Sequence, residues 1–148
     1  MEYIRHADET GCIFCQALKE KDDEKNLILL RGETSFIIMN RFPYNPGHLM
    51  VAPNVHKSHF DKLSDDEILE IIRLVERSTR TLEEVMRPEG FNVGINLGRI
   101  AGAGIEGHLH LHIVPRWQGD TNFMPIIGKA KVVSEALNAT YAHLKSKF

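Results

Sequence analysis

The stretch His108-Leu109-His110-Leu111-His112-Ile113-Val114 places a histidine at every second position and an aliphatic residue between each pair. Successive side chains of a β-strand point to opposite faces, so residues 108–114 are predicted to form a strand with three imidazoles on one face. The aliphatic side chains should enter the core. Same-face neighbours lie about 6–7 Å apart along a strand. Imidazoles at that spacing suit a row of ligand atoms, such as successive phosphate oxygens.

Four more apolar runs predict the other strands of a sheet. They cover residues 27–30, 36–39, 48–52 and 91–97. The first two flank a turn-rich segment and should pair as an antiparallel hairpin, and the third follows the turn signal Pro46-Gly47. Together with the histidine stretch, these runs predict five strands.

Two helices complete the predicted fold. Ser64 and Glu67 have the spacing of a capping box, and apolar residues then recur at helical spacing until Pro88 ends the pattern. The apolar positions are Ile68, Ile71, Ile72, Val75, Leu82, Val85 and Met86. Residues 134–147 predict a second amphipathic helix. Strands joined mostly by short loops, with a long helix to cover them, predict an α+β fold with a five-stranded antiparallel sheet.

The composition is that of an ordinary globular protein. Of the 148 residues, 43% are hydrophobic and 26% charged, which fits one domain over residues 1–148, with an N-terminal segment 1–25 and a core 26–148. A formal net charge of -2 argues against the broad basic surface of a non-specific nucleic-acid binder. Because neither a signal-peptide pattern nor a run of 18 apolar residues occurs, we expect a cytoplasmic protein without membrane contact.

The only two cysteines, Cys12 and Cys15, have the Cys-x-x-Cys spacing of a zinc knuckle. In a reducing compartment they are expected to be thiols, metal ligands or a redox pair rather than a structural disulfide. No βαβ pattern flanks the pair, which disfavours a thioredoxin-like role. A zinc site would need two further ligands, so the spacing alone leaves the choice open.

The histidine stretch also has two readings besides phosphate binding. It could be a polar strand face that happens to be rich in histidine. It could also be a catalytic metal site, because His-x-His on a strand has metal-ligand spacing. Such a site would use the three histidines with Glu106 or Asp120, and the lack of a nearby acidic cluster makes it the weakest reading. The glycine-rich residues 98–107 could form either a connector or an anion cradle.

The alternation of histidines and aliphatic residues resembles the signature of the histidine-triad (HIT) family, and the resemblance covers nearly the whole chain. Asn45 to Val51 is similar to the family's Pro-Gly-His strand, and the long helix has the expected place between the two motifs. Further segments resemble the branch of bacterial diadenosine tetraphosphate (Ap4A) phosphorylases. They are Tyr44 to His48, Ala101 to Gly104, Pro115 to Trp117, and Gly119 to Phe123.

The resemblance implies a HIT-like fold and an enzyme that cleaves dinucleoside polyphosphates at the α-phosphate through a nucleotidyl-histidine. His110 would be the nucleophile, with its second ring nitrogen held by the backbone carbonyl of His108. His112 would bind the bridging oxygen and assist the leaving group, and His48 would orient that group. Either phosphate or water could be the acceptor. The alternative is a nucleotide-binding regulator that slowly hydrolyses phosphoramidates or nucleotides.

The resemblance also implies nucleotide contacts. Asn40 would contact the ribose and Asn96 another polar group, although each could instead be an asparagine that forms a turn. Gly102 and Gly104 would cradle phosphate, and Trp117 could stack on a base or seal a dimer edge. The phenylalanines that are either core residues or a wall of the base pocket are Phe14, Phe36 and Phe42.

In related branches that carry the cysteine pair, the remaining zinc ligands correspond to His56 and His108, with His59 as the reserve. The site implied by this resemblance is a closed Cys2His2 tetrahedron, which is structural rather than catalytic. Many family members have Gln and Ser or Thr just before the triad, where this chain has Gly104 and Ile105. That departure favours the phosphorylase branch. The family further implies a homodimer.

Overall fold

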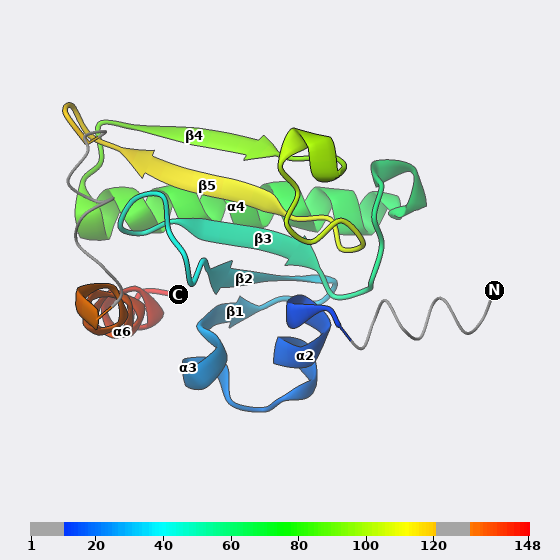
Figure 1. Ribbon diagram of the computed structural model, residues 1–148, viewed down its shortest axis with the longest axis horizontal. Coiled ribbons are helices and arrows are strands. Elements are labelled where there is room, and N and C mark those ends of the chain that lie inside the picture. Colours follow the sequence, from blue (N-terminus) through cyan, green and yellow to red (C-terminus); the bar gives the residue numbers. More distant parts are fainter. Residues whose placement is uncertain (1–10, 121–130) are drawn as a thin grey trace.

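The computed structural model describes residues 11–120 and 131–148. Its centre is a five-stranded sheet in the order β1-β2-β3-β5-β4, and every neighbouring pair is antiparallel (Figure 1). The strands are β1 Ile28–Arg31, β2 Ser35–Met39, β3 Leu49–Pro53, β4 Gly90–Ile95 and β5 Leu111–Arg116. The predicted α+β fold with a five-stranded antiparallel sheet is confirmed.

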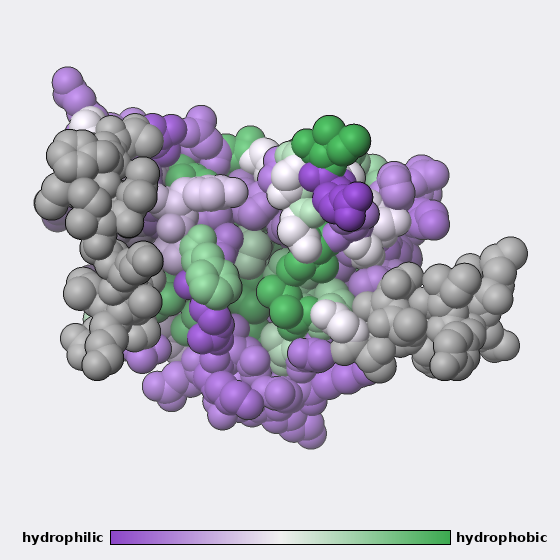
Figure 2. Space-filling model, in the orientation of Figure 1, coloured by the Kyte–Doolittle hydropathy of each residue, from purple (hydrophilic) through white to green (hydrophobic). Residues whose placement is uncertain are grey.

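Helices cover the sheet on both faces. They are α2 Ile13–Lys19, α3 Asp23–Asn26, α4 Asp65–Met86 and α6 Lys131–Lys145, with 3-10 turns η1 Phe60–Lys62 and η2 Arg99–Ala101. The helix α4 runs behind the sheet in Figure 1 and contacts β2, β3 and β5, whereas α2 packs on the opposite face. Figure 2 looks onto that second face, where apolar residues at the centre are bordered by hydrophilic residues over α2 and α3. Among the described residues, no helix is both long enough and apolar enough to cross a membrane.

The predicted capping box begins α4. The side-chain oxygen of Ser64 accepts a hydrogen bond from the backbone N–H of Glu67, and the helix ends at Arg87 in a left-handed conformation just before Pro88. The helix therefore starts and stops where its local sequence requires. The second predicted helix begins at Lys131, three residues earlier than expected.

The predicted buried face of α4 was partly wrong. Ile71 and Leu82 are buried, but Ile68 and Ile72 are 37% and 56% exposed. The line that faces the sheet instead includes Leu74 and Ser78. A serine is tolerated there because its hydroxyl donates to the carbonyl of Leu74 at 2.7 Å. Ile68 and Ile72 therefore do not face the sheet and leave part of their apolar surface exposed.

The predicted strand 108–114 begins three residues late, at Leu111. The reason is a tertiary hydrogen bond: the N–H of Leu109 donates to the carbonyl of Lys57 at 2.7 Å and so does not join the sheet ladder. Pairing with β3 covers only Leu111 to Ile113. Two other predicted strands also shift, since β3 starts at Leu49 and β4 ends at Ile95.

Candidate functional site

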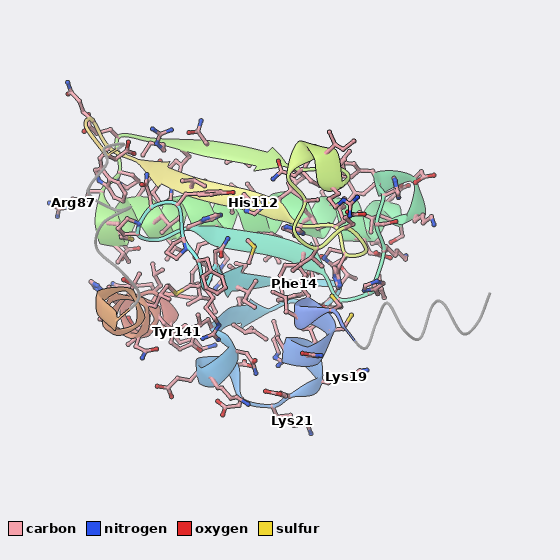
Figure 3. All side chains as sticks on the ribbon, in the orientation of Figure 1. Phe14, Lys19, Lys21, Arg87, His112 and Tyr141 are labelled. Atoms are coloured by element: carbon pink, nitrogen blue, oxygen red, sulfur yellow. The ribbon has the colours of Figure 1, made fainter. Side chains whose placement is uncertain are left out.

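Four histidines gather where β5 enters the sheet. His48, His108 and His110 are buried, and His112 is half-buried. The ring of His112 lies 4.9 Å from that of His110 and 5.1 Å from that of His48, measured between centroids. Figure 3 labels His112 on β5 and Phe14 on α2, on the face of the sheet away from α4. The sequence-predicted catalytic histidines are therefore brought together.

The ring of His110 has a defined proton position. Its Nδ1 lies 2.8 Å from the backbone carbonyl of His108, and a carbonyl can only accept, so Nδ1 carries the proton. Burial lowers the pKa of His110 more than this hydrogen bond raises it, which keeps the ring neutral near pH 7. The lone pair of a neutral imidazole then lies on Nε2. His110 accordingly presents a nucleophilic nitrogen.

A chain of hydrogen bonds places the proton of His112 on Nε2, whereas that of His110 is on Nδ1. The backbone N–H of Tyr44 donates to Nδ1 of His48 at 3.2 Å, so His48 carries its proton on Nε2. Burial, assisted by the positive charge that His112 or His110 would carry, lowers the pKa of His48 to about 4. Nε2 of His48 lies 2.9 Å from Nδ1 of His112 and donates to it. His112 therefore carries its own proton on Nε2.

The conformation of the loop at residues 44–48 is fixed by a glycine and by side-chain hydrogen bonds. Gly47 has φ +80°, and a Cβ there would lie 2.7 Å from Sδ of Met86, so only glycine fits. The side-chain amide of Asn45 donates to the carbonyl of Pro115 at 2.9 Å and to Asp120 at 2.7 Å. These contacts tie the loop to the end of β5. The sequence offered no signal for them, because they join residues about 70 positions apart.

A second cluster lies next to these four histidines and shares His108 with them. Cys12, Cys15, His56 and His108 place one ligand atom each within 4.8 Å of one another. Sγ of Cys12 lies 3.4 Å from Nδ1 of His108, and Sγ of Cys15 lies 3.4 Å from Nδ1 of His56 and 3.6 Å from Nδ1 of His108. Both cysteines are free thiols. The four residues implied as metal ligands are thus assembled.

The geometry of this cluster fits zinc. Zinc bonds of about 2.3 Å to sulfur and about 2.0 Å to nitrogen at tetrahedral angles put neighbouring S and N ligand atoms about 3.6 Å apart. Nε2 of His108 donates to the carbonyl of Pro53 at 2.7 Å, which leaves the Nδ1 lone pair for a metal. His59 is exposed, bonds Ser58, and lies outside the cluster. A Cβ at Gly107 would lie 2.7 Å from Nε2 of His56, so this glycine makes room for the ligand.

The alternative catalytic metal site is not assembled in the described part of the chain. Asp120 instead binds Arg116 and Asn45, and Glu106 faces Arg99 at 3.9 Å. Neither acid belongs to a group of converging ligands around His110 among residues 11–120 and 131–148.

The aromatic residues divide between core and surface. Phe14 is fully buried, with its ring 5.2 Å from His108, 5.1 Å from His110 and 6.0 Å from Phe36. Phe36 is also fully buried, whereas Phe42 is 83% exposed. Phe14 therefore packs against both His108 and His110, and Phe36 is a core residue.

The residues predicted to contact the nucleotide are Asn40, Asn96, Gly102 and Gly104. Asn40 accepts from the N–H of Phe42 at 2.9 Å, which is the turn alternative, while Asn96 lines a pocket with His112. Gly102 has φ +93°, and a Cβ there would lie 3.7 Å from the amide nitrogen of Asn96; one at Gly104 would meet nothing within 4 Å.

Trp117 lies elsewhere, in an apolar cavity of about 760 Å³ beyond the loop that carries His48. The resemblance at residues 121–123 falls outside the described residues.

Comparison with known proteins gives a family and several relatives. The HIT domain model matches residues 21–119. An AP-4-A phosphorylase of Mycobacterium tuberculosis is 44% identical over 123 residues, which cover 83% of this chain but only 63% of that relative. An adenosine 5'-monophosphoramidase of Schizosaccharomyces pombe is 33% identical, covering 72% and 74% of the two chains. A zinc-bound histidine triad family protein from Mycobacterium smegmatis is 25% identical, with a TM-score of 0.67 over 95% and 99% of the two chains.

Proposed function

This chain belongs to the HIT domain family, and from that premise we propose that it cleaves dinucleoside polyphosphates such as Ap4A at the α-phosphate. One observation carries the proposal. His110, whose lone pair is on Nε2, and His112, whose proton is on Nε2, have ring centroids 4.9 Å apart. This pair supplies a nucleophile and a hydrogen-bond donor for displacement at phosphorus.

In the first step, Nε2 of His110 attacks the α-phosphorus and forms a P–N bond. The bond from phosphorus to the bridging oxygen breaks, and the leaving polyphosphate takes its electron pair while Nε2–H of His112 donates a hydrogen bond to that oxygen. The hydrogen bond from Nδ1 to the carbonyl of His108 holds the positive charge that develops on His110. Backbone amides of the glycine-rich loop at Gly102 and Gly104 would face the phosphoryl oxygens.

In the second step an acceptor oxygen attacks phosphorus, the P–N bond breaks, and its electron pair returns to His110. A phosphate dianion attacks through an oxygen that carries no proton, whereas water releases its proton to solvent as it adds; Nε2–H of His112 remains a hydrogen-bond donor in both cases. Phosphate as acceptor gives ADP, and water gives AMP. We favour phosphate, because the 44% identical relative is named a phosphorylase, although this chain spans 63% of that relative's length.

Product analysis tests the reaction. The protein is incubated with Ap4A, with and without inorganic phosphate, and the nucleotides are separated. We expect ADP plus ATP, formed only with phosphate. AMP plus ATP in both samples would instead identify a hydrolase, and an unchanged substrate in both would contradict the proposed function.

The similarity to an adenosine 5'-monophosphoramidase favours a second candidate, a nucleotide-binding regulator that turns over phosphoramidates slowly. It uses the same histidines with ammonia or an amine as the leaving group. If adenosine 5'-phosphoramidate is cleaved and Ap4A is bound but not cleaved, this candidate is correct.

We also propose a zinc ion as a structural cofactor, held by Cys12, Cys15, His56 and His108. Four protein ligands fill a tetrahedral zinc, so no position remains for substrate. The ion would supply a crosslink between the N-terminal segment and the residues that precede β5. Thiolate ligands require reduced cysteines, which supports a cytoplasmic location. Nucleotides are the proposed partners, without a nucleic acid or membrane role.

A homodimer is the remaining proposal for the assembly. The strand β4 is an edge of the sheet, and its pairing groups on one side have no neighbour among the described strands. Val93 on β4 is 46% exposed. An exposed edge strand with apolar neighbours is a surface that proteins usually cover.

Sedimentation of wild-type protein at micromolar concentration is expected to give about twice the chain mass of 16.8 kDa. Val93→Glu should shift the protein toward the monomer, because it places a charge on the proposed interface. Ile13→Glu is the matched control, since Ile13 is 54% exposed but lies on α2. A monomeric wild type, or equal effects of the two variants, would rule out this interface.

A further inference from the structure

A pocket of about 540 Å³ opens beside His112, on the side of β5 that faces β4. Its floor comes from these two strands, and its wall comes from Tyr44 and Asn45. Pockets of this size hold small-molecule ligands. Among the residues that line it, His112 acts in the proposed reaction and Asn96 is a proposed nucleotide contact, whereas Tyr44 and Asn45 position His48. Asn92 and Gly94 on β4 have no assigned role.

The pairing of β4 with β5 places a glycine directly beside His112. In an antiparallel pair, residues opposite one another point to the same face, and Gly94 lies opposite His112 while Asn92 lies opposite Val114. A Cβ at Gly94 would meet no atom within 4 Å. The missing side chain therefore leaves open space beside His112, which is called the shelf below.

The strand order places the shelf at one edge of the sheet. In the order β2-β3-β5-β4, Asn40 follows β2 and Phe14 flanks His110 from α2, whereas the pocket lies over β4. The transferred nucleotide must place its α-phosphorus at His110, and its leaving group must reach His112, whose ring lies 4.9 Å from that of His110. The pocket over β4 opens beside His112.

We propose that this pocket receives the leaving group, a nucleoside polyphosphate, and that Gly94 is the residue that admits it. This inference rests on the proposed function. When His110 bonds to the α-phosphorus, the bond to the bridging oxygen breaks, and the departing polyphosphate takes its electron pair while that oxygen accepts a hydrogen bond from Nε2–H of His112. It leaves across the shelf at Gly94.

The chemistry of the lining suits such a group. Asn92 and Asn96 carry amides that can both donate and accept hydrogen bonds. Arg116 lines the same pocket; its guanidinium is ion-paired with Asp120 and also donates to Oδ1 of Asn92 at 2.6 Å, so it orients the amide of Asn92. Tyr44 stacks on His48 and is 71% exposed, so it offers an aromatic surface to a base.

The test fills the shelf without disturbing the fold. Gly94→Ala and Gly94→Val add side chains into open space in a strand whose φ is not positive, and valine favours strands. Gly90→Val is the matched control: the same strand and the same face, with open space around its Cβ, but outside the pocket. Melting temperature and sedimentation verify that all variants keep the wild-type fold and assembly.

Two donors of the same nucleotide are compared in single turnover, with the nucleotidyl-histidine detected by intact-protein mass. One is Ap4A and the other is adenosine 5'-phosphorimidazolide, whose leaving group is a single small ring. For Gly94→Val we expect the rate from Ap4A to fall by about 100-fold and the rate from the imidazolide to stay within about threefold, because only the bulky leaving group meets the new side chain. Gly94→Ala should be intermediate, and Gly90→Val should leave both rates unchanged.

Equal losses from both donors would overturn the inference, because the pocket would then hold the transferred nucleotide. An unchanged rate from Ap4A would overturn it as well. A wild-type protein that forms the adduct from neither donor would instead contradict the proposed function, and the inference would fail with it.

Discussion

Replacing His110 by asparagine is expected to lower turnover of Ap4A by at least about 10⁴-fold, because the variant lacks the nitrogen that bonds to phosphorus. Nucleotide affinity should remain within roughly tenfold of wild type, since the pocket is retained. Steady-state kinetics and equilibrium binding measure the two quantities. His59→Asn is the matched control, because His59 is exposed and should affect neither.

The same experiment tests the covalent step. Wild-type protein quenched in acid during a single turnover should carry an added mass of one AMP, and His110→Asn should not. Substantial residual turnover in His110→Asn, or no adduct on a wild type that turns over, would favour direct attack by the acceptor and would falsify the covalent mechanism.

Loss of the metal cluster is expected to destabilise the protein strongly while sparing the chemistry. Elemental analysis of wild type should give close to one zinc per chain, and the double variant Cys12→Ser with Cys15→Ser should give none. Because ligand binding to zinc is coupled to folding, the melting temperature should fall by about 10 °C or more. The N-terminal segment should also become sensitive to protease. The rate of adduct formation should fall far less than in His110→Asn.

Two single variants separate the candidate histidine ligands. His56→Ala should lose zinc, because Nδ1 of His56 lies 3.4 Å from Sγ of Cys15. His59→Ala should retain it. If wild type holds no metal and the double serine variant melts like wild type, the cysteines are two thiols without a structural ion. If chelation stops catalysis without lowering the melting temperature, the metal is catalytic and His110 is one of its ligands.

Much of the fold was predictable because local patterns determine it. The capping box at Ser64 begins α4 where predicted, since a cap depends on residues three positions apart. Alternation in the histidine stretch correctly places Leu111 and Ile113 in the core, since strand side chains alternate whatever the sheet partners are. Leu109 is also buried in the core, but the strand itself starts only at Leu111, because the N–H of Leu109 bonds Lys57, more than 50 residues away.

In the candidate site, too, some features could be predicted from the sequence and others depend on the tertiary structure. Residue types and spacing, with the family resemblance, predicted which residues come together: the three histidines of the stretch with His48, and the four residues positioned to bind a metal. The proton positions could not be read in that way. The Nε2 proton of His112 depends on His48 and on the backbone N–H of Tyr44, and a backbone N–H is the same at almost every position.

Gly94 illustrates what sequence patterns leave out. In the sequence it is a glycine within an apolar run, and such a residue has several meanings in a strand. Its place opposite His112 follows from the pairing of β4 with β5, and the open space above it follows from the absence of any neighbouring atom within 4 Å of a Cβ. Periodicity and capping act over a few residues, so the local amino-acid sequence specifies helices, strands and reactive side chains. Strand order, register and hydrogen-bond direction arise from contacts between distant segments, and these set the direction in which the histidines can act.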